Sequence, residues 1–311
     1  MFSIVTGGAG FIGSHLVDAL VERGDRVCVI DSLISGNLDH IKDHISSGKV
    51  ELVFADLLTD GWQQACAGAD RIFHLAADPD VRGSAEIPLS VYENNVTATV
   101  MVLEAMRTYR VPEIVFTSTS TVYGEPSVIP TPEDYSPMVP ISVYGASKLA
   151  SEVMIASYCH TYDMKGSVFR FANIIGPRSN HGVIFDFIRK LRLDPGRLEI
   201  LGDGTQIKSY LSVFACVDGM LFASDHAPNR YNCYNLGSTD WIDVVSIADA
   251  VVSLMGLSDV EFVFTGGDRG WVGDVPKMLL SIEKITALGW SPPIGSEESV
   301  REAVRAGLLE L

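Results

Sequence analysis

A glycine-rich turn near the start of the chain constrains its fold more than any other feature. The segment Thr6-Gly7-Gly8-Ala9-Gly10-Phe11-Ile12-Gly13 joins an apolar stretch at Ser3–Thr6 to a stretch of helical periodicity at Ser14–Arg23. Glycines make such a turn tight and let its backbone approach a pyrophosphate, and the helix that follows offers free N–H groups and the positive end of its dipole. The pattern alone is also compatible with an ordinary tight turn, so the neighbouring segments must show whether it binds a dinucleotide.

A carboxylate at the end of the next predicted strand supplies that context. Asp31 ends the stretch Val27–Asp31, where a carboxylate accepts hydrogen bonds from the ribose hydroxyls of adenosine. A carboxylate there also repels a 2′-phosphate, which favours NAD over NADP. Asp31 could instead cap the turn formed by residues 32–37. Because strand, glycine turn, helix, strand and acid occur in this order, the sequence indicates a dinucleotide site.

Short β-branched stretches alternate with longer helical patterns through the first half of the chain. Near-continuously apolar strands between amphipathic helices are typical of a parallel sheet covered on both faces, and right-handed crossovers make it a doubly wound Rossmann sheet of the α/β class. The predicted strands are Ser3–Thr6, Val27–Asp31, Val50–Ala55, Arg71–Leu75, Glu113–Ser118 and Ser167–Arg170, and the predicted helices are Ser14–Arg23, Asn94–Arg110 and Gly145–Tyr162.

The pattern changes after about Gly176, where glycine and proline become frequent and the apolar stretches shorten. We therefore expect a NAD-binding Rossmann domain over residues 1–172 and a smaller, mixed α/β substrate lobe formed mainly by residues 173–311. A segment near 208–240 is expected to return to the first domain, with Tyr234–Gly237 as a strand of the main sheet.

Charge and composition exclude several classes of protein. The formal net charge of −16 repels the phosphate backbone of nucleic acids and anionic membrane surfaces. The start has no signal-peptide pattern, and no apolar stretch is long enough to span a membrane. The odd number of cysteines, five, argues against a disulfide framework, and His181 lacks a partner at metal-ligand spacing. We expect a soluble, cytoplasmic protein without a metal site.

Two features indicate a chemical centre. Tyr144 and Lys148 lie one turn apart on one face of a predicted helix, where an ammonium and a positive nicotinamide ring would stabilise a phenolate whose pKa is ordinarily near 10. The alternative is a surface pair formed by chance. The five consecutive hydroxyl residues Thr117–Thr121 follow the strand Ile114–Phe116 at the carboxyl edge of the sheet, where ligands bind in doubly wound folds.

Taken together, these motifs resemble those of the extended short-chain dehydrogenases/reductases, in the NAD-dependent epimerase/dehydratase family. The similarity covers nearly the whole chain, and the nearest members are the UDP-glucose (UDP-galactose) 4-epimerases. The residues that carry it are Thr6-Gly7-x-x-Gly10-x-x-Gly13, Asp31, His74-Leu75-Ala76-Ala77, Val122-Tyr123-Gly124, Tyr144-x-x-x-Lys148, Arg170–Asn173, Gly202–Tyr210 and Gly270–Pro276.

The resemblance also implies a reaction type. It places Thr119 at the catalytic Ser/Thr position of the family, followed by Ser120 and Thr121 where the dehydratases have Asp-Glu. A Ser or Thr hydroxyl cannot supply the additional acid and base that loss of water requires near neutral pH, so the residues support reversible hydride transfer and little beyond it. This indicates an NAD-dependent nucleotide-sugar 4-epimerase, with UDP-glucose and UDP-galactose as the first choice of substrate.

The implied mechanism is one of transient oxidation at the sugar C4. Tyr144 as phenolate removes the C4-hydroxyl proton while the C4 hydride passes to NAD, and the keto sugar turns over before the hydride returns. Thr119 hydrogen-bonds the same oxygen, and Lys148 lowers the Tyr144 pKa and binds the nicotinamide ribose. Since NAD is regenerated in each cycle, we expect it to be tightly held.

The remaining site residues follow from the resemblance. Amides of Phe11 and Ile12 are expected on the pyrophosphate, Asp56 and Leu57 at the adenine, and Asn94 and Asn95 at the start of a helix that covers the cofactor. Further cofactor residues are Gly7, Gly10, Gly13, Ser32, Gly36, Asn37, Leu75, Ala76 and Ala77; the substrate residues besides Thr119 and Tyr144 are Asn173, Val183, Glu199, Ile200, Leu201, Lys208, Arg269 and Asp274.

Some positions depart from the family pattern and leave alternatives open. Lys208 replaces a usual Arg, which exchanges a planar fork for a point charge on phosphate, and Trp271 stands where Arg is frequent, so Arg269 would supply that charge. The alternative activities are 4-epimerisation of UDP-N-acetylhexosamines or UDP-uronates. A catalytically silent NAD-binding regulator is the alternative from another class. Apolar residues exposed on the helices at Asn94–Arg110 and Tyr144–Tyr162 favour a homodimer.

Overall fold

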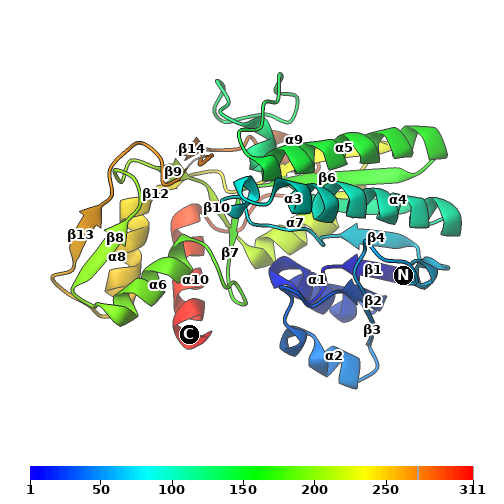
Figure 1. Ribbon diagram of the computed structural model, residues 1–311, viewed down its shortest axis with the longest axis horizontal. Helices are drawn as coiled ribbons and strands as arrows, with labels where there is room; N and C mark the ends of the chain where they lie inside the picture. Colours follow the sequence, from blue (N-terminus) through cyan, green and yellow to red (C-terminus); the bar gives the residue numbers. More distant parts are fainter. Residues whose placement is uncertain (272, 311) are drawn as a thin grey trace. The chain divides into compact units, whose positions relative to one another are not determined.

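A sheet of parallel strands organises the first part of the chain. In the computed structural model, which describes residues 1–271 and 273–310, seven of the described strands join in the order β11-β6-β5-β4-β1-β2-β3 (Figure 1). This is the predicted doubly wound order, with the reversal point between β1 and β4. The strands are β1 Phe2–Thr6, β2 Arg26–Asp31, β3 Val50–Phe54, β4 Arg71–His74, β5 Glu113–Thr119, β6 Lys165–Phe171 and β11 Tyr231–Leu236.

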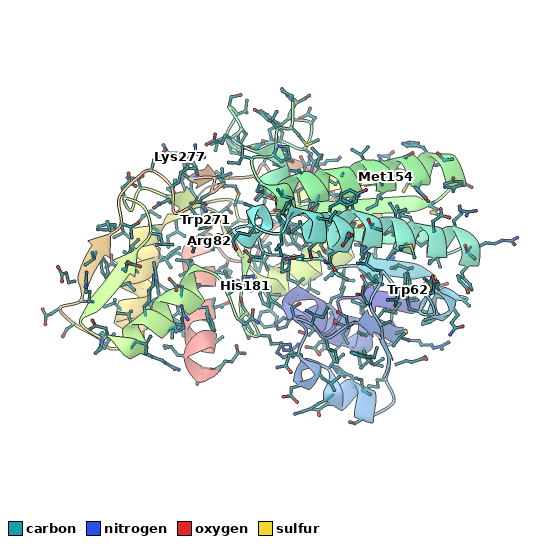
Figure 2. The ribbon with its side chains drawn as sticks, viewed as in Figure 1. Trp62, Arg82, Met154, His181, Trp271 and Lys277 are labelled. Carbon is teal, nitrogen blue, oxygen red and sulfur yellow. The ribbon has the colours of Figure 1, made fainter. Side chains whose placement is uncertain are left out.

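Alternation along the strands explains why both faces of this sheet are covered. Successive side chains of a strand point to opposite faces. Ile4, Ile72 and Ile114 belong to one core cluster with residues of α4 (Ala98–Tyr109) and α5 (Val143–Tyr162). The intervening Val5, Phe73 and Val115 are equally buried and face the other side, where α1 (Phe11–Glu22) contacts β1 and β2. Trp62, labelled in Figure 2, joins the first cluster.

The helices on the α5 side begin at places that the sequence only partly predicts. Ser142 caps α5 by accepting a hydrogen bond from the Gly145 amide at 3.0 Å. The helix expected at Asn94–Arg110 begins earlier: α3 spans Pro88–Tyr92 and continues through a π-helical turn, η4, at Glu93–Thr97 into α4. The helical periodicity of the first two turns is too short to read, and a π-helical turn has no periodicity of its own. The described chain also includes α2 Lys42–Ser46 and the short 3-10 turns η1 Leu38–His40, η2 Gln63–Cys66, η3 Gly83–Ala85 and η5 Ser120–Tyr123.

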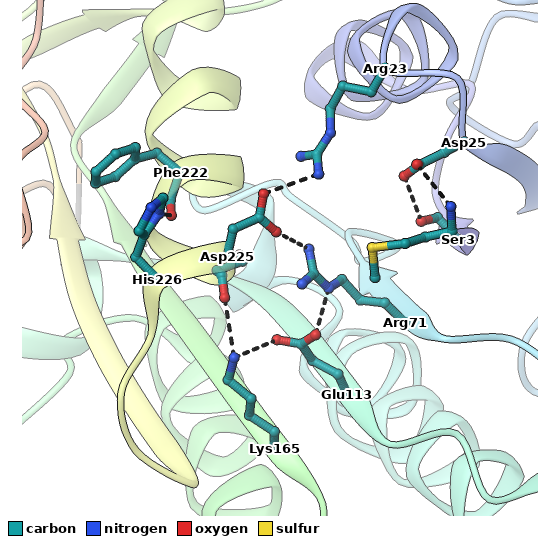
Figure 3. A network of polar contacts seen from close by, with 11 residues as sticks. Ser3, Arg23, Asp25, Arg71, Glu113, Lys165, Phe222, Asp225 and His226 are labelled. Atoms are coloured by element: carbon teal, nitrogen blue, oxygen red, sulfur yellow. Dashed lines mark hydrogen bonds and ion pairs between the residues drawn. The ribbon is translucent and has the colours of Figure 1, made fainter.

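A network of charged side chains joins the amino ends of three strands (Figure 3). Arg71 at the start of β4 donates to Glu113 at the start of β5 over 2.7 Å and to Asp225 over 2.9 Å. Lys165 at the start of β6 lies 3.3 Å from the Glu113 carboxylate, and Arg23 lies 3.0 Å from Asp225. The Arg71 and Glu113 side chains are buried, so each charge is compensated where water is scarce.

The remaining elements have a core of their own. The helices α6, α8 and α10 pack on one another, and their buried residues include Ile188, Val251 and Val304. Strand β8 pairs with β13 in parallel, β10 with β7, and β9 with β12 and β14. The bounds are β7 Asn173–Ile175, α6 Val183–Leu193, β8 Arg197–Ile200, β9 Ile207–Lys208, β10 Tyr210–Ser212, α7 Val213–His226, β12 Ile242–Asp243, α8 Val244–Leu254, β13 Glu261–Phe264, β14 Lys277–Met278, α9 Glu283–Ala287 and α10 Ser296–Glu310.

The chain separates into two compact units, each formed by segments distant in sequence. The first unit contains Met1–Gly124, Pro137–Arg170 and Leu221–Tyr234, and the second contains Glu125–Ser136, Phe171–Met220 and the residues from Asn235 onward. Among the described residues, no helix combines the length and the apolar content that crossing a membrane requires.

Candidate active site

The glycine turn leaves no room for side chains where a cofactor would approach. Gly7 has φ +71°, and a Cβ there would lie 2.7 Å from the Ala76 amide nitrogen. A Cβ on Gly13 would overlap the Gly7 carbonyl oxygen. Helix α1 starts at Phe11, and among the described residues no side chain caps its N-terminal amides. The turn therefore presents backbone N–H groups at a helix N-terminus, the arrangement that binds a pyrophosphate.

Asp31 holds the glycine turn and the following loop at the same time. Its carboxylate, 8% exposed, accepts hydrogen bonds from the Ala9 amide at 2.9 Å and the Leu33 amide at 2.8 Å. The Asn37 amide donates to the Ala9 carbonyl at 2.9 Å, and Gly36 packs against the Asp31 carboxylate. The capping and cofactor interpretations of Asp31 are thus compatible, because the same carboxylate joins the glycine turn to the loop that follows β2.

The other predicted cofactor residues divide into backbone supports and core residues. The amides of Leu75 and Ala76 donate to Thr6, at 3.1 Å to its carbonyl and 3.3 Å to its hydroxyl, which fixes the segment Leu75–Ala77 beside Gly7. Asp56 accepts from the Leu58 amide at 2.9 Å. The Leu57 side chain is buried and its carbonyl accepts from the Trp62 indole, while Ser32 is half-buried.

His74 is a hydrogen-bonded histidine of the core. It is fully buried between the hydroxyls of Thr6 and Thr99, at 2.7 and 3.0 Å. Burial, and next the positive charge of Lys148, lower the pKa of His74 to about 3. The imidazole is therefore neutral and has a structural role.

Asn94 and Asn95 do not open a helix, which corrects the sequence prediction, because both lie within the π-helical turn η4. Asn94 donates back to the Ser90 carbonyl at 2.9 Å. Asn95 is buried, accepts from the Asp78 amide at 2.7 Å and donates to the Ser147 hydroxyl at 2.9 Å. Asn95 thus ties the loop after β4 to the helix that carries Tyr144 and Lys148.

Tyr144 and Lys148 lie together near the start of α5. Lys148 is 3% exposed, and its ammonium donates to the Thr117 carbonyl at 2.9 Å and lies 6.0 Å from the centre of the Tyr144 ring. Burial lowers the pKa of Lys148 to about 7, against the opposing influence of Glu152. Burial, and next the Asp78 carboxylate, raise the pKa of Tyr144 above its usual value. A positive charge bound near Tyr144 would act against both influences and favour the phenolate.

Thr119 is the last residue of β5 and caps the 3-10 turn η5. Its hydroxyl oxygen accepts from the Thr121 amide at 3.2 Å and from the Thr121 hydroxyl at 3.1 Å. The hydroxyls of this turn lie at the carboxyl end of the sheet, on the strand whose Thr117 carbonyl binds Lys148. One unit thus brings together the phenol, the ammonium and the hydroxyl that the sequence predicts as catalytic.

Sequence reasoning did not assign a role to a buried network beside these groups. Glu152, one turn after Lys148, accepts from the Ser118 hydroxyl and from Arg170, with Arg170 Nη2 at 2.7 Å. Arg170 in turn donates to the Tyr123 hydroxyl at 2.9 Å. The signal in the sequence was the spacing of Lys148 and Glu152, which places both on one face of the helix.

The predicted phosphate ligands of the second unit are paired with acids. Lys208 lies 2.5 Å from the carboxylate of Asp274, which is 3% exposed, and Arg269 lies 2.6 Å from Glu125. The Trp271 ring (Figure 2) lies 5.4 Å from the Lys208 ammonium, and within the described chain its indole N–H is buried without a hydrogen-bond partner. Val272, part of the same motif, lies outside the described residues.

The other predicted substrate residues of the second unit lie in regular elements. Asn173 begins β7 and its amide group donates to the Ser209 carbonyl at 3.1 Å, and Val183 is the first residue of α6. In β8 the carbonyls of Glu199 and Ile200 accept from Lys190 and Thr265, and that of Leu201 accepts from Gln206. The Ile200 side chain is fully buried.

The fold and this set of residues define a dinucleotide-dependent enzyme of the short-chain dehydrogenase/reductase type. The comparisons with known proteins agree. Residues 3–237 match the NAD-dependent epimerase/dehydratase family. A putative UDP-glucose 4-epimerase of Methanocaldococcus jannaschii is 33% identical over 308 residues, which cover 97% of this chain and 96% of that protein.

Solved structures are similar over the whole chain. A crystal structure of a UDP-galactose 4-epimerase has a TM-score of 0.90 at 42% identity, with 100% of both chains covered. The UDP-glucuronic acid 4-epimerase of Bacillus cereus, in complex with UDP-glucuronic acid and NAD, has a TM-score of 0.91 at 26% identity, again over 100% of both chains. The chain belongs to the NAD-dependent epimerase/dehydratase family. It is an NAD-dependent nucleotide-sugar 4-epimerase whose cofactor is NAD.

Among the described residues, no side chain caps the first amides of α1, and these amides together with the buried Asp31 carboxylate fit that cofactor. Among residues 1–271 and 273–310, no group of three or more His, Cys, Asp and Glu side chains is arranged to hold a metal ion.

Proposed function

We propose that the chain interconverts UDP-glucose and UDP-galactose. The observation that carries the reaction type is the hydroxyl-only turn after β5: Ser120 and Thr121 follow Thr119, and none of the three can act as an acid or base near neutral pH. Sugars are thus oxidised and reduced here without loss of water or carbon dioxide. The choice of hexose rests on the 42% identity to a UDP-galactose 4-epimerase over the whole chain.

The proposed roles follow from the positions of the side chains. When bound, NAD supplies the hydride acceptor and donor, and its pyridinium supplies the positive charge that Tyr144 requires. Tyr144 takes the proton of the C4 hydroxyl, and Thr119 hydrogen-bonds the same oxygen. Lys148, held by the Thr117 carbonyl, stabilises the phenolate and binds the nicotinamide ribose. Asp31 accepts from the adenosine ribose, and Phe11 and Ile12 bind the pyrophosphate through their amides.

We assign the NAD-binding role to the first unit and binding of the UDP portion to residues of the second. Lys208, Arg269 and Asn173 are the proposed diphosphate ligands. Lys208 and Arg269 exchange their carboxylate partners, Asp274 and Glu125, for phosphate oxygens. Each of these two cations already has a carboxylate beside it. The negative charge of a uronate's carboxylate would therefore be poorly compensated, which favours a neutral hexose over a uronate.

The test is to mix the purified protein, without added cofactor, with UDP-galactose and to follow the anomeric protons by NMR. We expect UDP-glucose to accumulate to the same final ratio that is reached from UDP-glucose. UDP-N-acetylglucosamine and UDP-glucuronate are run in parallel, because structures similar to this chain include epimerases of both. Turnover of one of these alone would replace the hexose assignment, and bound NAD without turnover of any sugar would revive the silent regulator.

We also propose a homodimer formed through α3 and α5. These helices pack on each other and leave Leu89, Tyr92 and Val153 exposed, at 67%, 53% and 61%. Exposed apolar patches of this kind mark association surfaces. Analytical ultracentrifugation should give a dimer for the wild type and a monomer for Val153→Glu; a monomeric wild type would contradict the proposal.

A further inference from the structure

A buried network fastens the catalytic helix to two strands. Glu152 on α5 accepts from the Ser118 hydroxyl on β5 and from Arg170 on β6, whose Nε and Nη2 lie 3.0 and 2.7 Å from its carboxylate oxygens. The exposed fractions of Glu152, Arg170 and Ser118 are 2%, 4% and 3%. Such a two-pronged, charge-assisted contact fixes both the distance and the orientation of the partners.

The network holds the residues that flank it on the strand. Ser118 lies between Thr117, whose carbonyl accepts from Lys148, and Thr119, whose hydroxyl is proposed to bind the sugar oxygen. Glu152 therefore holds the one residue between these two functional atoms. On the other side, Arg170 donates to the Tyr123 hydroxyl at 2.9 Å and fixes the turn that follows Thr119.

We propose that Glu152, held by Arg170, is a positioning residue that sets Lys148 and the end of β5 for the reaction at Tyr144 and Thr119. This inference rests on the proposed function, because it assumes the roles given there to Lys148, Tyr144 and Thr119. Glu152 touches neither sugar nor cofactor in this role and acts through Ser118 and Lys148.

The charged groups around Lys148 indicate that Glu152 also influences the Lys148 pKa. On its own helix Lys148 faces Tyr144 and Glu152; from β4 it faces His74, which is neutral. Asp78, from the loop after β4, acts on Tyr144, and Arg170 reaches the network from β6.

Burial lowers the pKa of Lys148, and Glu152 opposes this fall. Loss of the Glu152 charge, with Arg170 left in place, therefore lowers the pKa of Lys148 further.

The experiment compares two buried carboxylates, each paired with an arginine on a strand of the same sheet. Glu152→Gln removes the proposed positioning residue, and Glu113→Gln removes the carboxylate that pairs with Arg71 at the amino ends of the strands. For each variant, kcat and KM for UDP-galactose are measured as functions of pH. NAD affinity is measured over the same range by isothermal titration calorimetry.

For Glu152→Gln we expect kcat to fall roughly 10- to 100-fold, as for a misplaced catalytic group. The alkaline limb of the kcat profile and the inflection in NAD affinity both move to lower pH by about one unit, because Lys148 loses its proton sooner. Glu113→Gln should lower the melting temperature and leave kcat and both pH curves unchanged.

Two further variants separate positioning from charge. Glu152→Asp keeps the negative charge but its shorter side chain no longer reaches Ser118. Its kcat should therefore fall while its pH curves stay unchanged. This variant also tests the proposal if Glu152→Gln fails to fold. Ser118→Ala keeps the Glu152–Arg170 pair and should likewise lose kcat without a shift.

If Glu152→Gln behaves like Glu113→Gln, with lower stability and unchanged kcat and pH curves, the network is structural only and the proposal is wrong. If the wild type turns over no UDP-sugar, the proposed function fails separately. The NAD titrations then still decide: a shifted inflection in Glu152→Gln supports the positioning of Lys148, and an unmoved one overturns it.

Discussion

Two buried arginine–glutamate pairs lie at opposite ends of one sheet and have different neighbours. Arg71 and Glu113, at the amino ends of β4 and β5, are joined by further charged groups, Lys165, Asp225 and Arg23 (Figure 3). Arg170 and Glu152, toward the carboxyl ends, are joined instead by hydroxyls, those of Ser118 and Tyr123. The pairs are chemically alike, so a buried ion pair does not by itself indicate function.

The difference follows from the topology of the sheet. In a doubly wound fold, ligands bind outside the carboxyl ends of the strands and not at the amino ends. The charged groups of the amino-end network are therefore expected to interact only with one another. The carboxyl-end network instead fixes the positions of Lys148 and Thr119, because Glu152 binds Ser118 between Thr117 and Thr119. The comparison teaches that the neighbours of a pair, and the edge at which it lies, decide its role.

The largest expected effect tests whether the chemistry resides at the carboxyl end. Tyr144→Phe removes only the phenolic oxygen, so turnover of UDP-galactose should fall by roughly 10³-fold, as when a general acid–base group is lost. Rates from the NMR assay, with the melting temperature and the NAD content as controls, check this. A variant that keeps a tenth or more of the activity would break the assignment of the site.

The next effect concerns stability at the amino end. Glu113→Gln leaves Arg71 buried with a weaker partner, so the free energy of unfolding should decrease by about 3 kcal/mol. Urea titration measures it, and kcat of the folded fraction should equal that of the wild type. A loss of kcat at unchanged stability would mean that the two ends of the sheet are coupled.

Protonation of His74, at the carboxyl end of β4, should lower the free energy of unfolding at acidic pH. The pKa of His74 in the folded chain, about 3, lies below its ordinary value of 6.5, so the unfolded chain binds a proton first as the pH falls. Stability from this group is complete above pH 6.5 and is lost below it, by about 2 kcal/mol at pH 5. Unfolding free energies at pH 7 and pH 5 should differ less in His74→Gln than in the wild type; an equal difference would contradict this.

The smallest effect concerns the glycine turn at the same carboxyl edge. In Gly13→Ala the new Cβ overlaps the Gly7 carbonyl oxygen, so the turn must open and the Kd for NAD should rise at least about tenfold, or about 1.4 kcal/mol. Gly196→Ala is the control, because the nearest atom to its Cβ, in Asp194, is 3.6 Å away. Equal affinities in the two variants would show that the turn does not contact the cofactor.

Sequence reasoning predicts the parallel sheet and the use of NAD for a physical reason. The glycine turn, Asp31 and the apolar strands are local patterns, and each restricts the backbone within a few residues. The helix at Asn94–Arg110 shows where such reasoning stops: α3 is too short, and η4 too irregular, to leave a periodic signal. The rise in the Tyr144 pKa was likewise not visible in the sequence, because burial by the surrounding fold and, next, the Asp78 carboxylate cause it, and Asp78 is far away in the sequence.

The sequence by itself determined the fold class, the dinucleotide turn and the residue types at the chemical centre, because turn geometry and strand periodicity are properties of neighbouring residues. Only the tertiary structure decided that Glu152 meets Arg170 and Ser118, that Lys148 binds the Thr117 carbonyl, and that Lys208 faces Asp274. These contacts join residues from different strands and helices, and no local pattern specifies them. They form when the order of the strands brings these helices and strands together, and burial then strengthens the interactions between the charged groups.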